Sequence, residues 1–173
     1  MVYAKAPDAG RKARLEHWIA AYGDDILRMC FVYLSDMNLA EDAMQDTFLK
    51  AWNNMAQFEQ KNGSTAKTWL TRIAINTCHD YHRSRWFRHV DRTKVLQEIT
   101  AEQVPVATQE RALFFALLTL PVKHKQTVLL YYYQGMTLQE IADCLSISVS
   151  AVHQRLLKAQ KLLKTSLEKE GLQ

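Results

Sequence analysis

The sequence predicts an all-α fold, in which two small helical domains are joined by a flexible linker. Apolar residues recur at the three-and-four spacing of an amphipathic helix along most of the chain. Gly and Pro are few, at five and three in 173 residues, and no segment alternates as a strand does. Between His89 and Thr108 the aromatic anchors vanish, and Pro105 interrupts any helix. We therefore expect a first domain over 12–90, a linker over 91–108 and a second domain over 109–170.

Composition indicates a folded protein of the cytoplasm. Hydrophobic residues make up 48% of the chain, which is enough for real cores. No apolar run approaches the roughly 20 residues that span a bilayer, and the first residues lack the apolar middle of a secretory signal. We expect no membrane insertion. Cys30, Cys78 and Cys144 lie far apart, which suits buried thiols in a reducing compartment better than a disulfide framework.

Charge is distributed unevenly around a net value of +4. Basic residues gather in 83–92 and 149–167, whereas 36–46 holds acids and no base. Two basic stretches and one acidic helix indicate a polyanionic partner and a separate basic partner.

The second predicted helix of the first domain has two distinct faces. It follows a first helix whose apolar residues span 15–33. Asn38 offers an N-cap oxygen, with Glu41 placed to return the bond in a capping box. The helix runs to about Met55, because the polar stretch 57–64 cannot continue it. Its inner face is predicted to be Ala43, Met44, Phe48, Ala51, Trp52 and Met55. An acidic face is then left outward, made of Glu41, Asp42, Gln45, Asp46 and Leu49.

The third predicted helix is capped by Ser64 or Thr65 and continues to about Arg88. Its predicted buried residues are Trp69, Leu70, Ile73, Cys78 and Tyr81. Spacings of four, three and four place a polar stripe on its outside, made of Arg72, Asn76, His79 and Arg83. Arg and Asn on such a stripe can hold phosphates and read base edges.

Four helices are predicted in the second domain. Pro121 ends the first and starts the next, and Gly135 caps that helix at its C-terminal end. Thr137 and Glu140 form a capping box for the third. Val128, Leu129, Tyr132 and Tyr133 lie along the second helix. The residues that line the last helix are Val149, Val152, Leu156, Ala159, Leu162 and Leu163.

The last two helices have the pattern of a helix-turn-helix. Ala142 is small enough for the helices to cross closely, and Ile147 and Val152 would wedge them at a fixed angle. Gln can bridge an adenine edge, and Lys can reach guanine or phosphate. An ordinary two-helix corner with a solvated basic face remains an alternative at this point. The side chains predicted to be exposed are Ser150, His153, Gln154, Leu157, Lys158 and Lys161.

Two stretches of sequence resemble the same family, and they occur in the family's order. AEDAMQDTFLKAW (40–52) and KTWLTRIAIN (67–76) closely resemble region 2 of bacterial RNA polymerase sigma factors. The pattern LP…G-x-T-x-x-EIA-x-x-L…V-x-x-RL…A, over 120–159, resembles region 4. No other sigma region is present, so the chain is identified over 12–167 as similar to extracytoplasmic-function (ECF) sigma factors. It departs from the family at Ser146, where Gly is frequent, and at His153, Gln154 and Gln160, where many members carry Arg, Lys or Ser.

The resemblance implies a transcription initiation factor, not an enzyme. Such a protein directs core RNA polymerase to specific promoters, here in response to stress, and is held by an anti-sigma protein. Region 2 docks on the basic β′ coiled coil, and the polymerase β subunit is a further partner. Gln45 and Asp46 align with the family's polymerase-contacting pair. The implied polymerase-binding residues are Glu41, Asp42, Gln45, Asp46 and Leu49.

The resemblance also implies two promoter contacts. The third helix faces the minus-ten element, and the loop before it captures an unstacked base, at a cost of a few kcal/mol that new contacts offset. The implied minus-ten residues are Lys61, Asn62, Ser64, Arg72, Asn76, His79 and Arg83. The implied minus-thirty-five residues are Ser150, His153, Gln154, Arg155, Leu157, Lys158 and Lys161.

Two other functions remain open from the residues alone. A helix-turn-helix regulator that acts without polymerase would use the same terminal helices, but it leaves 40–52 and 67–76 unexplained. A helical enzyme would use Cys78 and His79. Cys78 and His82 lie one helical turn apart, but no second ligand pair completes a tetrahedral site, so no metal or cofactor is expected.

Overall fold

The computed structural model describes residues 7–60, 65–83 and 108–169. The chain divides into two compact units, Met1–Phe87 and Arg88–Gln173. Within the described ranges every regular element is a helix and no strand occurs, so the all-α prediction is confirmed. No helix in these ranges combines the length and the apolarity needed to cross a membrane.

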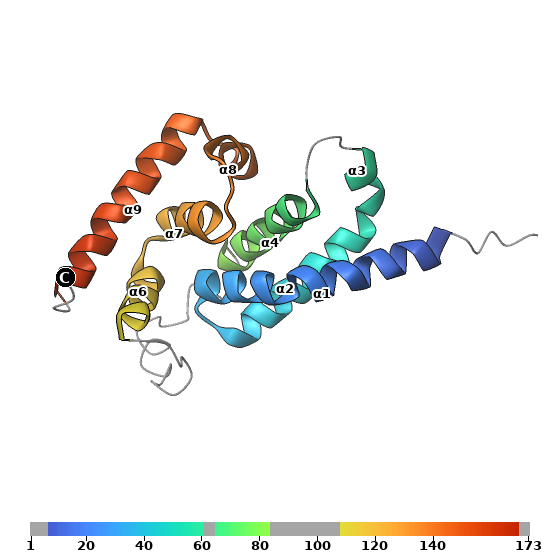
Figure 1. Cartoon of the computed structure of the whole chain (residues 1–173), viewed down its shortest axis with the longest axis horizontal. Coiled ribbons are helices and arrows are strands. Elements are labelled where there is room, and N and C mark those ends of the chain that lie inside the picture. The colour runs from blue at the N-terminus through green and yellow to red at the C-terminus, as the bar shows by residue number, and fades with distance from the viewer. Residues whose placement is uncertain (1–6, 61–64, 84–107, 170–173) are drawn as a thin grey trace, which may run out of the picture. The chain divides into compact units, whose positions relative to one another are not determined.

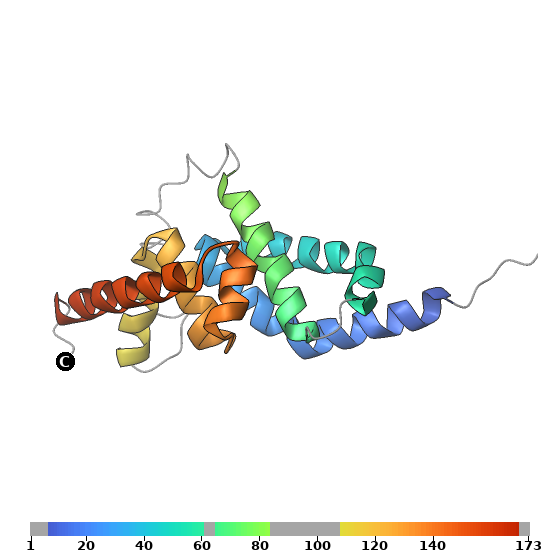
Figure 2. The same cartoon turned by 90° about the horizontal axis from the view of Figure 1, so that it is seen from above.

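The described residues of the first unit form a bundle of four helices: α1 (Pro7–Leu34), α2 (Met37–Asn53), α3 (Met55–Gln60) and α4 (Ala66–Arg83). α1 and α2 run beside each other in opposite directions (Figure 1), and α4 crosses both of them (Figure 2). Each helix contributes a narrow apolar stripe to one core, as expected for amphipathic helices. The core residues include Trp18, Ile26, Met29, Cys30, Tyr33, Ala43, Phe48, Ala51, Met55, Leu70, Ala74, Ile75 and Cys78.

The start of α2 differs from the sequence prediction. Asp36 is the N-cap, because its side chain accepts a hydrogen bond from the amide of Leu39 at 2.9 Å. Asn38 is an exposed residue inside the first turn. The chain bends sharply at Ser35, which has a φ of 59°, and the bend leaves Asp36 extended, as an N-cap residue must be. The predicted cap at Asn38 is therefore wrong by two residues.

The end of α2 also differs. A break at Asn54 separates α2 from α3, and α3 continues through Gln57 to Gln60, where a polar loop was predicted. Phe58 holds α3 in place, with ring centroids 5.4 Å from Trp18 and 5.0 Å from Trp69. Aromatic contact therefore outweighs the polar character of this segment.

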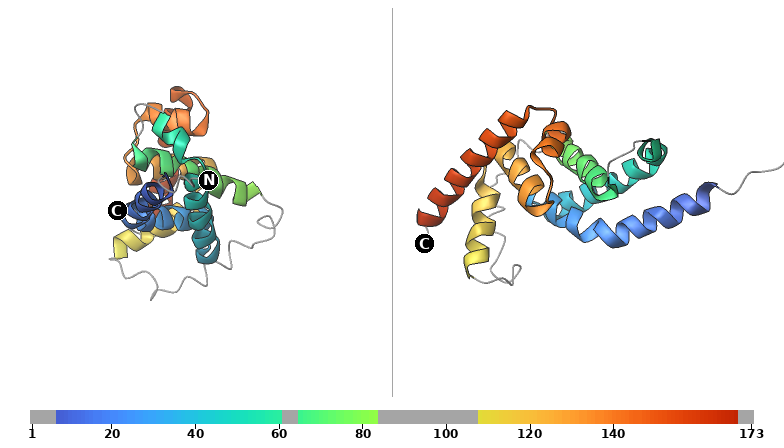
Figure 3. Two further views of the ribbon diagram at one scale, coloured as in Figure 1. Left: turned by 90° about the vertical axis from the view of Figure 1, so that its right-hand side faces the viewer. Right: turned by 45° about the horizontal axis from the view of Figure 1, so that its top comes forward.

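The second unit contains α6 (Thr108–Thr119), α7 (Val122–Val128), the π-helix η2 (Leu129–Tyr133), α8 (Leu138–Leu145) and α9 (Val149–Lys169). The long helix α9 packs against α6, α7 and α8, and Figure 3 shows it beside α6. As predicted, Pro121 separates two helices, and Gly135 follows with a φ of 69°. Buried Lys125 donates a hydrogen bond to the carbonyl of Leu118, 2.7 Å away, near the end of α6.

Tyr132 and Tyr133 do not face the core. They are 58% and 41% exposed, whereas Leu129 and Leu130 are buried. The π-helix explains this, because its wider turn shifts the following side chains out of the α-helical phase on which the prediction was based. On α9, Val152, Leu156 and Ala159 are buried as predicted, but Val149 and Leu162 are each 37% exposed.

Candidate nucleic-acid and polymerase interfaces

Local hydrogen bonds fix the two ends of α8. The Thr137 hydroxyl accepts from the amide of Glu140 at 3.2 Å, and Glu140 accepts from the amide of Thr137 at 2.8 Å. This is the predicted capping box. At the other end Ser146 adopts the left-handed conformation, with a φ of 54°, so a serine fills a position that favours glycine. Ser148 then starts α9, because its hydroxyl accepts from the amide of Ala151 at 3.1 Å.

Small and branched residues at the crossing of α8 and α9 set their close approach. Ala142 on α8 is 3% exposed and Val152 on α9 is fully buried, while Ile147 in the turn is half-buried. The amide of Ile147 donates to the carbonyl of Ala142 at 3.0 Å, which closes the turn. α8 and α9 therefore form the helix-turn-helix predicted from the sequence, with a rigid corner.

Six of the seven residues predicted to read the minus-thirty-five element are exposed on α9. Leu157, at 54% exposure, is the apolar one among them. Arg155 is half-buried, and its carbonyl oxygen lies 3.2 Å from Nδ1 of His124 on α7. The six exposed residues are Ser150, His153, Gln154, Leu157, Lys158 and Lys161.

The polar stripe of α4 also lies at the surface. Thr65 caps the helix, because its hydroxyl accepts from the amide of Thr68 at 3.1 Å. The stripe residues Arg72, Asn76, His79 and Arg83 are all exposed. Lys61, Asn62 and Ser64, predicted for the base-capturing loop, lie outside the described residues.

The acidic face of α2 lies at the surface, with one exception. Glu41, Asp42, Gln45 and Leu49 are exposed, and Leu49 is 60% exposed. Asp46 is half-buried, because the hydroxyl of Tyr81 on α4 donates to its Oδ2 at 2.9 Å. Burial, followed by this hydrogen bond, raises the pKa of Tyr81 to about 12. The sequence placed Tyr81 in the core without a polar role, because a contact between residues 35 apart leaves no local signal.

An apolar groove with a volume of about 780 Å³ runs between α1 and α2. It includes Leu15 and Ile19 of α1 together with Gln45 and Leu49 of the acidic face. Arg11 borders the same region, with its guanidinium 4.7 Å from the centroid of the Trp52 ring. The acidic face is thus continuous with an apolar surface.

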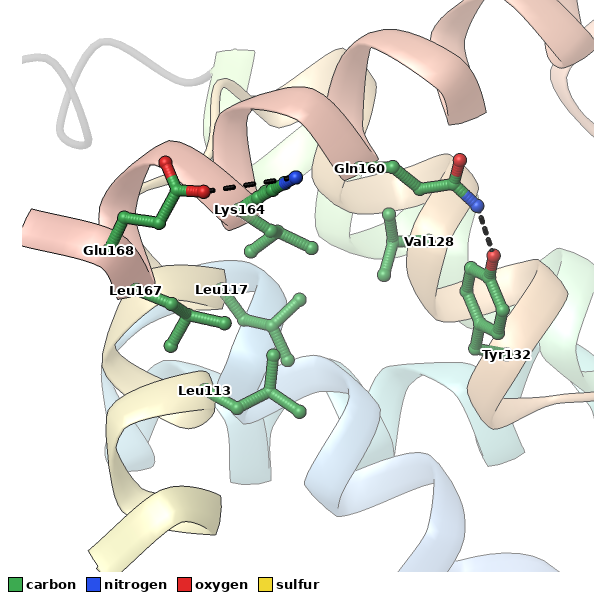
Figure 4. Close-up of a pocket in the computed structure, with 9 residues that line it drawn as sticks. Leu113, Leu117, Val128, Tyr132, Gln160, Lys164, Leu167 and Glu168 are labelled. Carbon is green, nitrogen blue, oxygen red and sulfur yellow. Dashed lines mark hydrogen bonds and ion pairs between the residues drawn. The ribbon is translucent and has the colours of Figure 1, made fainter. Parts of the chain in front are cut away.

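A second groove of about 780 Å³ lies on the second unit, between α6, η2 and the C-terminal half of α9 (Figure 4). Leucines form its floor, and a hydrogen bond of 2.6 Å from Gln160 to the Tyr132 hydroxyl crosses its rim. The sequence did not indicate this groove, because nothing in it predicted the π-helix that carries Tyr132. Its lining includes Leu113, Leu117, Val128, Leu163 and Leu167.

The three cysteines are buried thiols. A hydrogen bond with Cys30, followed by burial, raises the pKa of Cys78 well above its ordinary value, which makes a thiolate nucleophile unfavourable. His79 is exposed, whereas Cys78 is fully buried. Among the described residues no group of three His, Cys, Asp or Glu side chains can hold a metal ion.

Two family models match the chain, one for each unit. The model described as Sigma-70 region 2 matches residues 18–88, and the model described as Sigma-70, region 4 matches residues 116–165. These are the two regions that the sequence motifs resemble.

Curated relatives agree with these matches. The chain is 31% identical over 144 residues to the ECF RNA polymerase sigma factor SigL of Mycobacterium tuberculosis, covering 79% of each chain. It is 27% identical to the RNA polymerase sigma factor SigV of Bacillus subtilis, covering 93% of this chain and 95% of SigV. It is also 28% identical to the probable RNA polymerase sigma factor RfaY of Xanthomonas campestris. That match covers 86% of this chain, which spans only 39% of RfaY.

Two solved structures share the fold. One is the sigma factor RpoE of Bartonella quintana in complex with the anti-sigma factor NepR. It has a TM-score of 0.69 at 20% identity, and the match covers 88% of this chain and 96% of RpoE. The other is CnrH in complex with the cytosolic domain of CnrY. It has a TM-score of 0.67 at 22% identity, and the match covers 93% of this chain and 92% of CnrH. The two sigma-70 models and the 31% identity to SigL show that the chain belongs to the ECF RNA polymerase sigma factors, which direct core polymerase to promoters and initiate transcription.

Proposed function

We propose that the two units divide promoter recognition between them, and that each residue group has one binding role. The observation that carries this assignment is the separation of charge. An exposed acidic face lies on α2. Exposed polar stripes without acidic residues lie on α4 in the first unit and on α9 in the second. A basic protein surface suits the acidic face, and a polyanion suits the stripes.

The acidic face of α2 is assigned to the polymerase β′ coiled coil. Its residues Glu41, Asp42, Gln45 and Leu49 are exposed, and the apolar groove beside them adds surface for burial. Charged residues around an apolar patch are typical of protein interfaces. The polymerase-independent regulator gives no role to this face.

The stripe of α4 is assigned to the minus-ten element. Arg72 and Arg83 can neutralise phosphates, and Asn76, between them, can pair with a base edge. The segment containing Lys61, Asn62 and Ser64 directly precedes α4 in the chain, and we assign it the capture of an unstacked base.

The first half of α9 is assigned to the minus-thirty-five element. The exposed residues of α9 from Ser150 to Lys161 include basic and amide side chains but no acidic one. The apolar groove of the second unit uses α9 from Gln160 onward, so it leaves most of the residues assigned to DNA uncovered. We assign this groove to the polymerase β subunit, because the second unit needs its own protein contact to be held at a fixed distance from the first.

We further propose that an anti-sigma protein regulates the chain in response to stress. Of the two solved structures described above, one is a sigma factor bound to the anti-sigma factor NepR, and the other is CnrH bound to the cytosolic domain of CnrY. The two apolar grooves supply the surface that an inhibitor must cover in order to block polymerase.

Run-off transcription tests the assignment. The full chain is added to core polymerase and a library of genomic fragments, and the start sites are sequenced. We expect defined starts that require both components, and an aligned set of upstream elements. Asp42→Lys should abolish these transcripts, whereas the matched control Asp24→Lys, an exposed acid of α1, should retain them. Equal activity of the two variants would contradict the docking face.

A further inference from the structure

Two hydrogen bonds between α2 and α4 lie one helical turn apart on each helix, beside an ion pair of 3.8 Å between Lys50 Nζ and Asp80 Oδ2. The Tyr81 hydroxyl donates to Asp46 Oδ2 at 2.9 Å, and Lys50 Nζ donates to Thr77 Oγ1 at 3.0 Å. Lys50 follows Asp46 by four residues, and Tyr81 follows Thr77 by four. Only the hydrogen bond from Tyr81 ends on a residue of the proposed docking face, which is Asp46.

We propose that Tyr81 is a positioning residue for polymerase binding: its hydroxyl holds the Asp46 carboxylate in the orientation that the basic polymerase surface meets. The inference rests on the proposed docking role of α2 and names a residue outside that face. Tyr81 itself need not touch the polymerase.

Asp46 is the pre-ordered member of the acidic face. Glu41, Asp42 and Gln45 are exposed, and within the described ranges no hydrogen bond or ion pair holds their side chains. Asp46 is half-buried and fixed through Oδ2. A side chain that is already fixed loses less rotamer freedom when a partner binds, so it contributes more to affinity than a mobile one of equal charge.

The direction of the hydrogen bond is maintained at neutral pH. The pKa of Tyr81 is raised to about 12, first by burial and then by Asp46 itself. The Tyr81 phenol therefore keeps its proton and donates a hydrogen bond to Asp46. Oδ1 meets no other donor within the described ranges, so it remains available to a Lys or Arg of the partner.

Tyr81→Phe removes this hydroxyl and leaves the ring in place. With full-length chain and core polymerase, we expect the dissociation constant to rise roughly threefold to tenfold. Thr77→Val is the matched control. It removes the hydroxyl that accepts from Lys50 and that also donates to the carbonyl of Ile73 at 2.9 Å. We expect Thr77→Val to lower Tm at least as much as Tyr81→Phe does, with unchanged affinity for core polymerase.

Combining variants separates this inference from the docking assignment. If Tyr81→Phe acts through Asp46, it should add nothing in an Asp46→Ala background. If Asp46→Ala weakens polymerase binding and Tyr81→Phe does not, the positioning role is overturned while the docking face stands. If neither Asp46→Ala nor Asp42→Lys weakens binding, the docking face and the role of Tyr81 both fail. Equal loss of affinity in Thr77→Val and Tyr81→Phe would assign the effect to general destabilisation and also overturn the inference.

Discussion

The ring of His124 contacts the carbonyl oxygen of Arg155 through Nδ1 at 3.2 Å, and this contact ties α7 to the first half of α9. Burial lowers the pKa of His124 below 6.5, and the Arg155 carbonyl only partly opposes that shift. The unfolded chain therefore binds a proton more readily than the folded chain. Stability is fully present above pH of about 6.5 and falls as the pH drops towards the lowered pKa of the folded state.

Melting curves at about pH 5.5 and about pH 7.5 test this first prediction. His124→Gln should reduce the loss of Tm between the two conditions relative to the natural chain. His153→Gln, at an exposed position on α9, should leave the loss unchanged. An identical pH dependence in all three proteins would show that His124 is not the group that titrates.

Gln154 and Lys161 are expected to contribute differently to promoter binding. Gln154→Ala should change the preferred minus-thirty-five sequence, with about 1–3 kcal/mol of discrimination lost at one base pair. Lys161→Ala should weaken binding to all sequences alike and reduce the steepness of its salt dependence. Binding of the polymerase complex to a randomised promoter set, at two salt concentrations, measures both effects. Uniform losses from both variants would contradict direct base readout by Gln154.

Asn76 is expected to act at the minus-ten element after polymerase has bound. Asn76→Ala should slow promoter opening while leaving affinity for core polymerase unchanged, because the side chain is exposed on α4 and belongs to the polar stripe, not to the proposed docking face of α2. Permanganate reactivity of unpaired thymines reports the opening. Asn53→Ala, at an exposed site on α2, is the matched control and should open the promoter normally.

The turn between α8 and α9 stores backbone strain at Ser146, whose φ is 54°. Ser146→Gly should stabilise the second unit by about 0.5–1 kcal/mol, because glycine adopts this conformation without a Cβ clash. The net gain is smaller than the full relief of that clash, because glycine loses more conformational freedom on folding. Ser148→Ala should act in the opposite direction, by about 1 kcal/mol, because it removes the cap of α9. Thermal or urea unfolding measures both changes. A lower stability for the glycine variant would indicate that the serine side chain makes a compensating contact.

Cys78→Ala separates transcription initiation from thiol chemistry. The substitution should leave run-off transcription intact and cost about 1 kcal/mol of stability for the lost volume. A buried thiol with a raised pKa should also react with aromatic disulfide reagents only as fast as the unit opens. Loss of transcription in a variant that remains folded would restore the enzymatic alternative.

Much of the fold was predictable because its signals are local. The capping box of Thr137 and Glu140 is read from two residues three apart, and Pro121 marks a helix boundary by itself. The exposure of the α4 stripe and of the α9 face follows from helical phase. Ala142 marks the close crossing because only a small residue fits there.

The remaining features depend on packing between distant residues or on a change of helical phase. The link from Tyr81 to Asp46 and the support of α3 by Trp18 and Trp69 arise from contacts far apart in sequence. The π-helix 129–133 shifts the phase, so the exposed tyrosines and the groove beside Tyr132 were missed. The N-cap at Asp36 was missed because the bend at Ser35 precedes it.

The contact of Phe58 with Trp18 and Trp69 gives the protein an intrinsic optical reporter. The ring centroids of the two tryptophans are 5.7 Å apart, so each indole senses movement of the other and of the phenyl ring. Phe58 and Trp69 lie in sequence on either side of the segment 61–64. We therefore expect emission from the two indoles to change when the proposed base capture occurs at this segment, in the natural chain and without an attached dye.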